Sequence, residues 1–411
     1  MNSFWTDPTY WLHTAVTISL LALAVPAVFP PLYLLWLTFH SKESDSPVPL
    51  ADAGRNLRFD IVVPAHDEAE GIAAVVENLL EIDWPRDQFR VMVIADNCSD
   101  STAERARRAG ALVVERRNLE LRGKGYALRR AFSISLAQRY ADAAVVVDAD
   151  SRVSRNLLQA FAGRLAGGTK VAQVFHGVLD PDRNRRNRLM AIAYAAFHRV
   201  RSRGRERRGL SCGIRGNGWC ISHQTLRTVP YEAHGLAEDI EYGLRLGIAG
   251  VRVEYIDSAQ VLSSMETDMA GAATQRNRWE AGRSSLPAAF TRQLLAPSPA
   301  STRLLRRDLG FDLLVPPLAT IALAVVLLTL VAGVAALALP HLLLPLAFLA
   351  GAAFASTALV IHVARGWQLS GTGHRGLLDL AAAPRFALWK LVLRFRSGEE
   401  ATWVRTRRVT S

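Results

Sequence analysis

Two aspartates separated by a single residue directly follow a run of three valines. Val145–Val147 is β-branched throughout, which favours a buried strand, and Asp148 and Asp150 come immediately after it. In open α/β sheets, ligands bind outside the carboxyl ends of the strands. Two carboxylates in that position suit Mg²⁺ or Mn²⁺ shared with a phosphate-bearing substrate. The alternative is a strand followed by an aspartate that caps the next turn.

Two more polar clusters follow predicted strands. His66–Glu68 comes after the apolar segment 59–64, and Asp96–Asp100 comes after 90–95. Each cluster alone is typical of turns, but parallel strands bring all three clusters to one edge of a sheet and predict a crevice lined with carboxylates. Lys124, between two glycines at a predicted helix start, suits a phosphate there, although a solvated surface lysine is the alternative. Neither a GxxxxGK[ST] loop nor a GxGxxG motif after the first strand is present.

The elements that position these residues alternate between strands and helices. The predicted strands are 59–64, 90–95, 112–114 and 145–147, and the predicted helices are 72–80, 101–110 and 123–140. This order predicts an α/β fold with a doubly wound, mostly parallel sheet. A glycine-rich turn, 214–220, leads into a further short strand at 219–222.

Six motifs, taken in order, resemble the membrane-bound family 2 glycosyltransferases. This group has the GT-A fold and includes cellulose, hyaluronan and chitin-oligosaccharide synthases. The motifs are VVPAHDE (62–68), IADNCSDST (94–102), GKG (123–125), DAD (148–150), AED (237–239) and QRNRW (275–279). The likeness covers about 59–285 and has two departures: Ala95 stands where the family often has a second acid, and Ala237 replaces a threonine.

The resemblance implies transfer of a sugar, with inversion, from a nucleotide-diphospho-sugar of the UDP or GDP type to a hydroxyl. It implies Mg²⁺ or Mn²⁺ on Asp150, with Asp148 on the same metal or on the ribose. Asp239 would be the catalytic base. The nucleotide and diphosphate would be bound by Pro64, Glu68, Asp96, Lys124, Asp148 and Arg278, and the acceptor by Asn217, Glu238, Gln275 and Trp279.

The motifs AED (237–239) and QRNRW (275–279) also have purely structural interpretations. Glu238 and Asp239 precede a helical pattern, and acids in a first turn complement the helix dipole in any protein. Gln275, Arg278 and Trp279 share one helical face, which a binding site needs and a packed helix also shows.

Composition and apolar runs predict a membrane protein. Half of the 411 residues are hydrophobic, and three runs, 11–39, 313–339 and 342–364, are long enough to span a bilayer. Pro26, Pro30 and Pro31 are expected to kink or shorten the first span. A cleaved signal peptide is disfavoured because this run is too long and no positive region precedes it. The three cysteines, Cys98, Cys212 and Cys220, are too few and too scattered for a disulfide framework or a zinc site.

The distribution of basic residues predicts the orientation. Residues 1–10 contain no Lys or Arg, whereas the segment after Ala364 is rich in arginine. The positive-inside rule then places the N-terminus outside and the catalytic region in the cytoplasm, with the chain in the cytoplasmic (inner) membrane. The expected division is a transmembrane helix (1–40), a linker (41–57), a catalytic domain (58–285), an interfacial segment (286–311), a transmembrane hairpin (312–365) and a basic tail (366–411).

The net charge of +12 favours phosphate-rich partners. The densely basic stretch Arg183–Arg208 encloses an apolar segment, which predicts an amphipathic helix on an anionic bilayer surface. Further interfacial helices are expected at 382–396 and within 284–305. Nucleic-acid binding is disfavoured because few aromatic residues interleave the basic ones.

Four functions compete at this point. The first is a glycosyltransferase that adds one sugar to a lipid-linked or other glycan acceptor, as in glycolipid or cell-envelope polysaccharide synthesis. The second is a processive polysaccharide synthase, which usually needs more spans. The third is a non-catalytic membrane scaffold, disfavoured because clustered acids are costly to keep without a role. The fourth, a nucleotidyltransferase, is disfavoured by QRNRW and the late Asp239.

Overall fold

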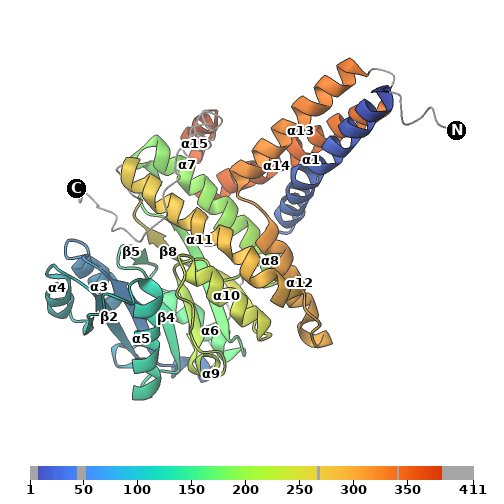
Figure 1. Cartoon of the computed structure of the whole chain (residues 1–411). Helices are drawn as coiled ribbons and strands as arrows, with labels where there is room; N and C mark the ends of the chain where they lie inside the picture. Colours follow the sequence, from blue (N-terminus) through green and yellow to red (C-terminus); the bar gives the residue numbers. More distant parts are fainter. Residues whose placement is uncertain (1–7, 44–51, 266–268, 340–341, 382–411) are drawn as a thin grey trace.

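A computed structural model describes residues 8–43, 52–265, 269–339 and 342–381 (Figure 1). Its α/β part contains one eight-stranded sheet. The strands are β1 (Phe59–Ala65), β2 (Phe89–Asp96), β3 (Leu112–Arg116), β4 (Ala143–Val146), β5 (Ser151–Val153), β6 (Val171–Val178), β7 (Trp219–Ser222) and β8 (Val253–Ser263).

The strand order β3-β2-β1-β4-β7-β6-β8-β5 confirms the doubly wound α/β fold predicted from the sequence. β1, β2, β3 and β4 pair in parallel, and the register joins Ile61 to Val91 and to Val145. β7 runs antiparallel to both of its neighbours, β4 and β6, and β5 is antiparallel to β8. The sheet is therefore mixed, with its parallel half formed by the strands that carry the predicted acids.

Alternation along the central strands builds two cores. Ile61 and Val63 face one layer of helices, while Val62 between them faces the other. The first layer contains α3 (Ile72–Leu80), α4 (Thr102–Arg108) and α6 (Leu157–Ala166). The second contains α5 (Lys124–Gln138), α9 (His223–Thr228) and α10 (Glu238–Ile248). Since both faces are covered, the strands consist almost entirely of apolar residues.

The remaining helices lie between strands of the sheet or between the sheet and the apolar bundle. They are α2 (Asp52–Arg55), η2 (Arg86–Gln88), η3 (Pro181–Arg183), α7 (Arg185–Tyr194), the π-helical turn η4 (Ala195–Val200), α8 (Arg201–Arg207), α11 (Met269–Leu295), α12 (Ala300–Leu314) and α15 (Gly373–Leu380). α10, α11 and α12 share a small core that includes Leu244, Phe290 and Leu309. The predicted interfacial segment within 284–305 therefore packs part of its apolar face against the catalytic region.

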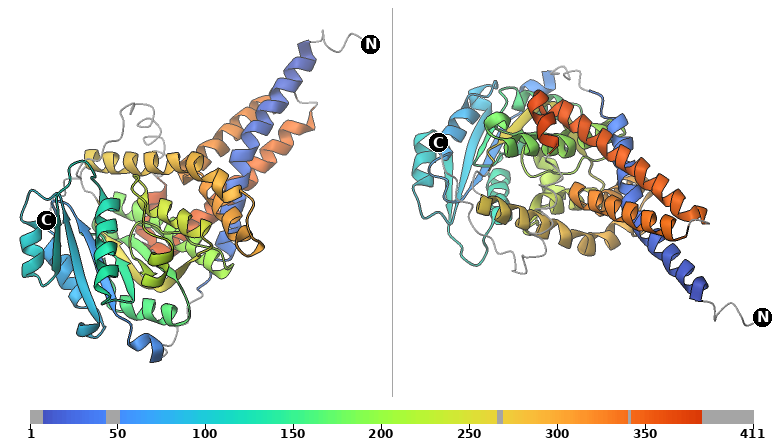
Figure 2. Two further views of the ribbon diagram at one scale, coloured as in Figure 1. Left: turned by 60° about the horizontal axis from the view of Figure 1, so that its bottom comes forward. Right: turned by 90° about the horizontal axis from the view of Figure 1, so that it is seen from above.

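Three helices project from one side of the α/β part as a bundle (Figure 2). They are α1 (Pro8–Phe39), α13 (Leu318–Ala338) and α14 (Leu343–Ser370), and each is long and apolar enough to cross a membrane. Small residues such as Ala27, Ala332 and Ala355 are buried where the helices meet, as in many membrane bundles. The three predicted spans are thus present as helices, and α1 continues past Pro26, Pro30 and Pro31 without being shortened.

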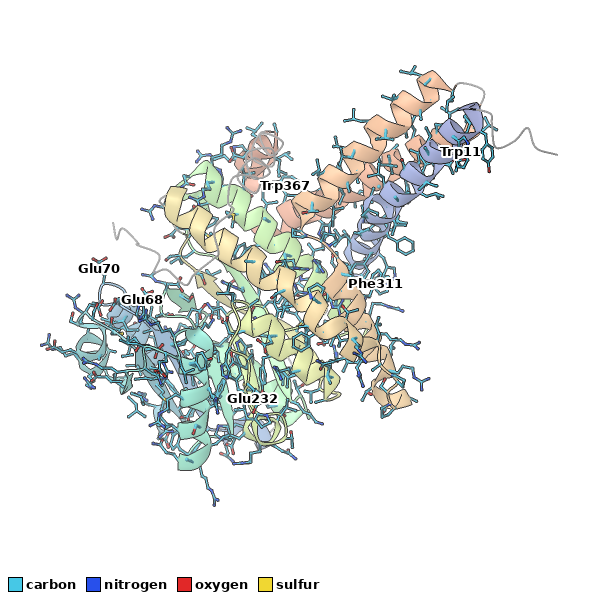
Figure 3. All side chains as sticks on the ribbon, viewed as in Figure 1. Trp11, Glu68, Glu70, Glu232, Phe311 and Trp367 are labelled. Carbon is cyan, nitrogen blue, oxygen red and sulfur yellow. The ribbon has the colours of Figure 1, made fainter. Side chains whose placement is uncertain are left out.

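The outer surface of the bundle matches a lipid environment. Large apolar side chains such as Phe29, Leu337 and Val360 are 62%, 86% and 67% exposed, which is unusual for a surface in contact with water. Trp11 lies near the outer end of the bundle, and Trp367 lies near the end that joins the α/β part (Figure 3). Aromatic side chains at both ends are typical of membrane interfaces.

Part of the basic stretch Arg183–Arg208 is buried inside the protein, contrary to the amphipathic surface helix predicted from the sequence. Arg201, Arg203 and Arg205 in α8 are each 4% exposed or less. Arg201 binds Asp312 at 2.7 Å, Arg203 binds Asp257, and Arg205 binds Asp308 and Asp312. The predicted position on the bilayer surface is wrong for these three arginines, because their charge is neutralised inside the protein. The other predicted interfacial helix, 382–396, lies outside the described residues.

Candidate active site

The carboxyl edge of the parallel strands opens into a cavity of about 690 Å³. Pro64 in β1, His66 directly after β1, and Asp96 at the end of β2 line this cavity, as do Asp148 and Asp150 in the loop after β4. The three polar clusters predicted to meet at one edge therefore do so. Glu68, Lys124, Glu238 and Asp239 also line this cavity.

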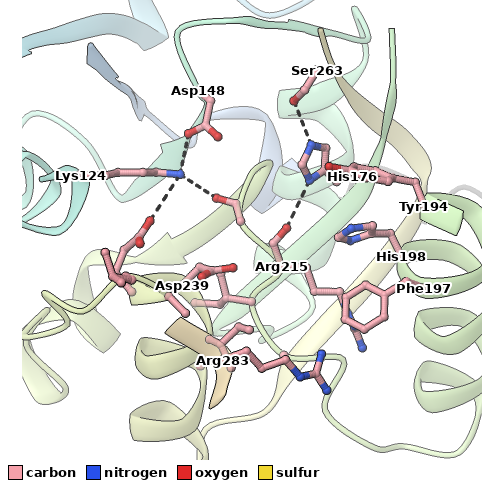
Figure 4. A pocket seen from close by; sticks show the side chains of 18 of the residues that line it. Lys124, Asp148, His176, Tyr194, Phe197, His198, Arg215, Asp239, Ser263 and Arg283 are labelled. Carbon is pink, nitrogen blue, oxygen red and sulfur yellow. Dashed lines mark hydrogen bonds and ion pairs between the residues drawn. The ribbon is translucent and has the colours of Figure 1, made fainter. Parts of the chain in front are cut away.

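Lys124 links the Asp-x-Asp motif to the first turn of α10 (Figure 4). Its Nζ lies 2.6 Å from Asp148 Oδ1 and 3.7 Å from Glu238 Oε1, and it donates a hydrogen bond of 3.0 Å to the carbonyl of Gly216. Burial favours a lower pKa for Lys124, but Asp148 and Glu238 outweigh it and raise the pKa above its ordinary value. Lys124 is therefore a fixed positive charge within the cavity.

The glycine that follows Lys124 has a packing role. A Cβ at Gly125 would lie 2.3 Å from the carbonyl oxygen of Ala233, so only glycine lets the start of α5 approach that loop. At Gly125 the structure shows that the close approach is to the protein's own backbone.

Glu238 and Asp239 occupy the first turn of α10 and point into the cavity. Burial, opposed by Lys124, raises the pKa of Glu238 to about 7 and also raises the pKa of Asp239. A carboxylate with a raised pKa is a stronger base than an ordinary aspartate, which suits proton abstraction near neutral pH. Asp239 Oδ2 lies 3.7 Å from the position that a Cβ on Gly216 would take. Asp239 and Lys124 therefore both lie close to Gly216, whose carbonyl binds Lys124.

Asp96 is held by a partner that the sequence did not indicate. Its Oδ1 accepts a hydrogen bond of 2.5 Å from Arg116 Nη1, at the end of the neighbouring strand β3. The Asp96 carbonyl is 2.6 Å from His66 Nδ1. These contacts fix the loop after β2 against the loop after β1. Asp96 is 5% exposed, so only a small part of its surface faces the cavity.

Asn217 makes its hydrogen bonds within the protein. Its side chain is fully buried; Oδ1 accepts from the Asp148 backbone N–H at 3.0 Å, and Nδ2 donates to Ser151 and Ser263. Asn217 does not line the cavity, and its amide groups are satisfied within the protein, so these contacts do not support the predicted contact with an acceptor, which stays a prediction. In this structure, Asn217 orients the backbone of the Asp-x-Asp motif.

His176 and Ser263 extend this hydrogen-bond network. His176 Nε2 is 2.9 Å from Ser263 Oγ, and its Nδ1 is 3.3 Å from the carbonyl of Arg215. Burial lowers the pKa of His176, so the imidazole is neutral at pH 7. This pair was not predicted from the sequence, because β6 and β8, the strands that carry His176 and Ser263, were not predicted.

The QRNRW motif lies on α11. The side chains of Gln275, Arg278 and Trp279 lie outside the described residues, so their predicted roles remain predictions. Other basic groups do reach the cavity: Arg201, Arg215 and Arg283 line it, and Arg283 donates to the carbonyl of Val315, just before α13. Arg215 was not predicted as a site residue, although it lies in the same glycine-rich turn as Asn217.

The donor set of the Asp-x-Asp motif fits a hard divalent cation. Asp148 and Asp150 both present carboxylates to the cavity, and Asp150 Oδ1 also accepts a hydrogen bond from Ser151 Oγ. A second acidic group, Asp67, Cys98 and Asp100, also brings its ligand atoms close together. Asp67 binds the Ser99 N–H at 2.6 Å, and Asp100 binds Thr102, so these two acids already hold the loop together.

A protein-family model described as "Glycosyltransferase like family 2" matches residues 57–282. This range contains every strand of the sheet and both acidic motifs. The chain belongs to the family 2 glycosyltransferases. The GT-A resemblance is supported by a solved mannosyltransferase from Pyrobaculum calidifontis, in complex with GDP-Man and Mn²⁺. It is 18% identical, has a TM-score of 0.53 and aligns over 94% of this chain and 99% of its own.

Two curated relatives of this family 2 glycosyltransferase come from different biosynthetic systems. A beta-monoglucosyldiacylglycerol synthase from Synechocystis is 28% identical over 290 residues, which is 66% of this chain and 56% of the relative. A UDP-forming cellulose synthase catalytic subunit from Komagataeibacter sucrofermentans is 26% identical over 298 residues, or 67% of this chain and 37% of the relative. The chain thus spans about half or less of the length of these relatives.

Proposed function

We propose that this glycosyltransferase moves a sugar from a nucleotide-diphospho-sugar to a hydroxyl of a lipid-linked acceptor, with inversion. The observation that carries the proposal is the extent of the cavity. One cavity is lined by Asp148, Lys124 and Asp239 and also by Leu34, Leu318 and Ile321 of the apolar bundle. An acceptor with hydrocarbon chains could lie along the bundle while its headgroup meets the carboxylates.

The proposed reaction is a single displacement. The acceptor oxygen attacks the anomeric carbon, the bond from that carbon to the diphosphate breaks, and the nucleoside diphosphate leaves. Asp239 takes the acceptor proton, and its raised pKa supports this role. Inversion is proposed because one displacement with one base suffices.

The nucleotide end of the site is also a proposal. Pro64, Glu68 and Asp96 would bind the nucleotide, and Lys124 would place positive charge beside the leaving diphosphate. Mg²⁺ or Mn²⁺, bound by Asp150 and Asp148, would neutralise charge on that leaving group. The solved mannosyltransferase with GDP-Man and Mn²⁺ supports a donor and metal of this kind.

We further propose that the catalytic domain, 58–285, lies in the cytoplasm, with the N-terminus outside and the bundle in the inner membrane. The support is the three apolar helices together with the arginine-rich sequence after Ala364. In this arrangement the cavity opens at the level of the cytoplasmic leaflet. Nucleotide sugar would then enter from the cytoplasm and lipid from the membrane.

The experiment is to incubate membranes containing the full chain with a panel of labelled UDP- and GDP-sugars and to analyse the product lipids. A lipid carrying one added sugar is expected. A long ladder of products would favour the processive synthase instead. No product with any donor, from protein that binds nucleotide, would contradict the proposed function.

A further inference from the structure

Three guanidinium groups surround one aromatic ring at the bundle end of the cavity. Phe197, in the π-helical turn η4, has Arg215 at 4.4 Å, Arg201 at 4.9 Å and Arg283 at 5.8 Å from its ring centroid. All four residues line the cavity, and Figure 4 shows Arg215 and Arg283 close to Phe197. A π-helical turn often marks a functional position because it displaces side chains from regular helical spacing.

Arg215 is buried and makes no ion pair with a carboxylate among the described residues, although the charge of Asp312 acts on it from farther away. Its side chain is 7% exposed, and both Nε and Nη2 are buried and make no hydrogen bond. Arg203 and Arg205, which are buried to a similar extent, bind Asp257, Asp308 and Asp312. A buried charge without a partner is costly, so a protein rarely keeps one unless a ligand neutralises it.

The charge balance around Arg215 is positive. Asp312 already binds Arg201 at 2.7 Å and Arg205 at 3.0 Å, so it is shared by two guanidinium groups. Arg283 donates to the Val315 carbonyl at 2.9 Å, which does not neutralise its charge. Burial, and then the charge of Arg201, lowers the pKa of Arg215 to about 10, which still leaves it protonated at neutral pH. This end of the cavity therefore attracts an anion.

Arg215 and Arg283 lie on the other side of Asp239 from Lys124 and the proposed donor site (Figure 4). Arg215 is adjacent in sequence to Gly216, whose carbonyl binds Lys124. The negative charge of Asp239 acts on both Lys124 and Arg283, and Asp239 lies between these two in Figure 4. Lys124 faces the Asp-x-Asp motif, where the donor diphosphate is proposed. Arg215 and Arg283 instead face Phe197 and the bundle, where the acceptor is proposed.

We propose that the acceptor lipid carries a phosphate group, which Arg215 and Arg283 bind beside Phe197 while its hydrocarbon chains lie against α1 and α13. This inference rests on the proposed function and narrows its acceptor to phosphate-bearing lipids. The planar guanidinium fork matches two phosphate oxygens. An uncharged glycolipid headgroup would leave Arg215 unneutralised. Leu34, Leu318 and Ile321 provide the adjacent apolar wall.

The test measures lipid binding to the full chain in a neutral detergent, with no nucleotide present. The probes are dihexanoylphosphatidic acid and dihexanoylglycerol, which differ only in the phosphate. The wild type is expected to bind the phosphatidic acid at least about tenfold more tightly. Arg215→Gln should weaken this binding by about 10- to 100-fold. Arg307→Gln, which removes an exposed arginine of α12 that does not line the cavity, should leave it unchanged.

Thermal unfolding separates this role from a structural one. Arg215→Gln removes an unpaired buried charge, so the Tm without lipid should stay the same or rise. An arginine needed for packing would give a lower Tm, and that result, with unchanged lipid binding, would overturn the proposal. Arg215→Lys keeps the charge without the fork, so partial retention of phosphatidic acid binding is expected.

Three other outcomes would overturn the proposal. They are equal binding of the two lipids to the wild type, competition by inorganic phosphate at the same concentration as the lipid, and loss of UDP and GDP binding rather than lipid binding in Arg215→Gln. A failure of the proposed function would give a different result from a failure of this inference. If selective binding of phosphatidic acid is found but no donor gives a product, the phosphate-lipid site stands and the transfer reaction does not.

Discussion

Replacing Glu238 by glutamine is expected to stabilise the protein at pH 8 and not at pH 5. Glu238 lies in the first turn of α10, is 13% exposed, and has Lys124 at 3.7 Å. Burial raises its pKa from 4.5 to about 7 even though Lys124 opposes the shift. The folded protein therefore holds this proton more tightly than the unfolded chain, so stability falls as pH rises from 4.5 to about 7.

The magnitude follows from the pKa difference. One pKa unit corresponds to about 1.4 kcal/mol, so the rise from 4.5 to about 7 costs about 3 kcal/mol above pH 7. Glutamine does not titrate and avoids this cost, although its buried amide keeps part of it. For a domain the size of 57–282 the expected increase in Tm at pH 8 is on the order of 5 °C.

The assay is thermal unfolding of the full chain in a neutral detergent at pH 5, 6, 7 and 8. A thiol-reactive fluorogenic dye reports unfolding, because Cys212 and Cys220 are buried in the folded protein. Glu241→Gln is the matched control. Glu241 lies in the same helical turn but binds Arg245 at 2.9 Å, so its loss should lower the Tm slightly at every pH.

A lower Tm for Glu238→Gln than for the wild type at pH 8 would refute the reasoning. A Tm difference that stays constant from pH 5 to pH 8 would also refute it, because the cost would then not come from ionisation of Glu238. If the variant is more stable but transfers sugar more slowly, Glu238 is a residue kept for function at the expense of stability.

Three other substitutions give distinct expectations. Asp239→Asn should lower the rate of sugar transfer by at least about 100-fold while UDP or GDP binding, measured by calorimetry, stays within about twofold; wild-type turnover would exclude Asp239 as the base. Asp150→Ala should abolish transfer together with the effect of Mn²⁺ on nucleotide binding, and wild-type activity that is unaffected by excess chelator would contradict a metal at this position. Gly204→Ala in α8 would place a Cβ 2.4 Å from the Leu37 carbonyl oxygen in α1, so Tm should fall by an amount equivalent to about 1–3 kcal/mol; an unchanged Tm would show that α1 and α8 can separate without cost.

Local patterns were sufficient to predict the framework of this protein. The alternating strands 59–64 and 90–95, the valine run before Asp148 and the three apolar helices were all predicted from the sequence. Each depends on the periodicity or length of one short segment. The meeting of the three polar clusters also followed, because parallel strands end at one edge. The strands β6 and β8 were not predicted.

Only the tertiary structure determines which polar side chains are available to bind a ligand. The sequence shows a dense basic stretch, but only the fold shows that Arg205 binds Asp308 and Asp312 about a hundred residues later, while Arg215 has no ion-pair partner within the part of the chain that the structure describes. It also shows that Asn217 is enclosed and that one cavity joins the Asp-x-Asp motif to the apolar bundle. Composition and spacing determine which elements form, because those depend on neighbouring residues. The neutralisation of a buried charge depends on residues that are distant in the sequence, and so only the folded chain determines it.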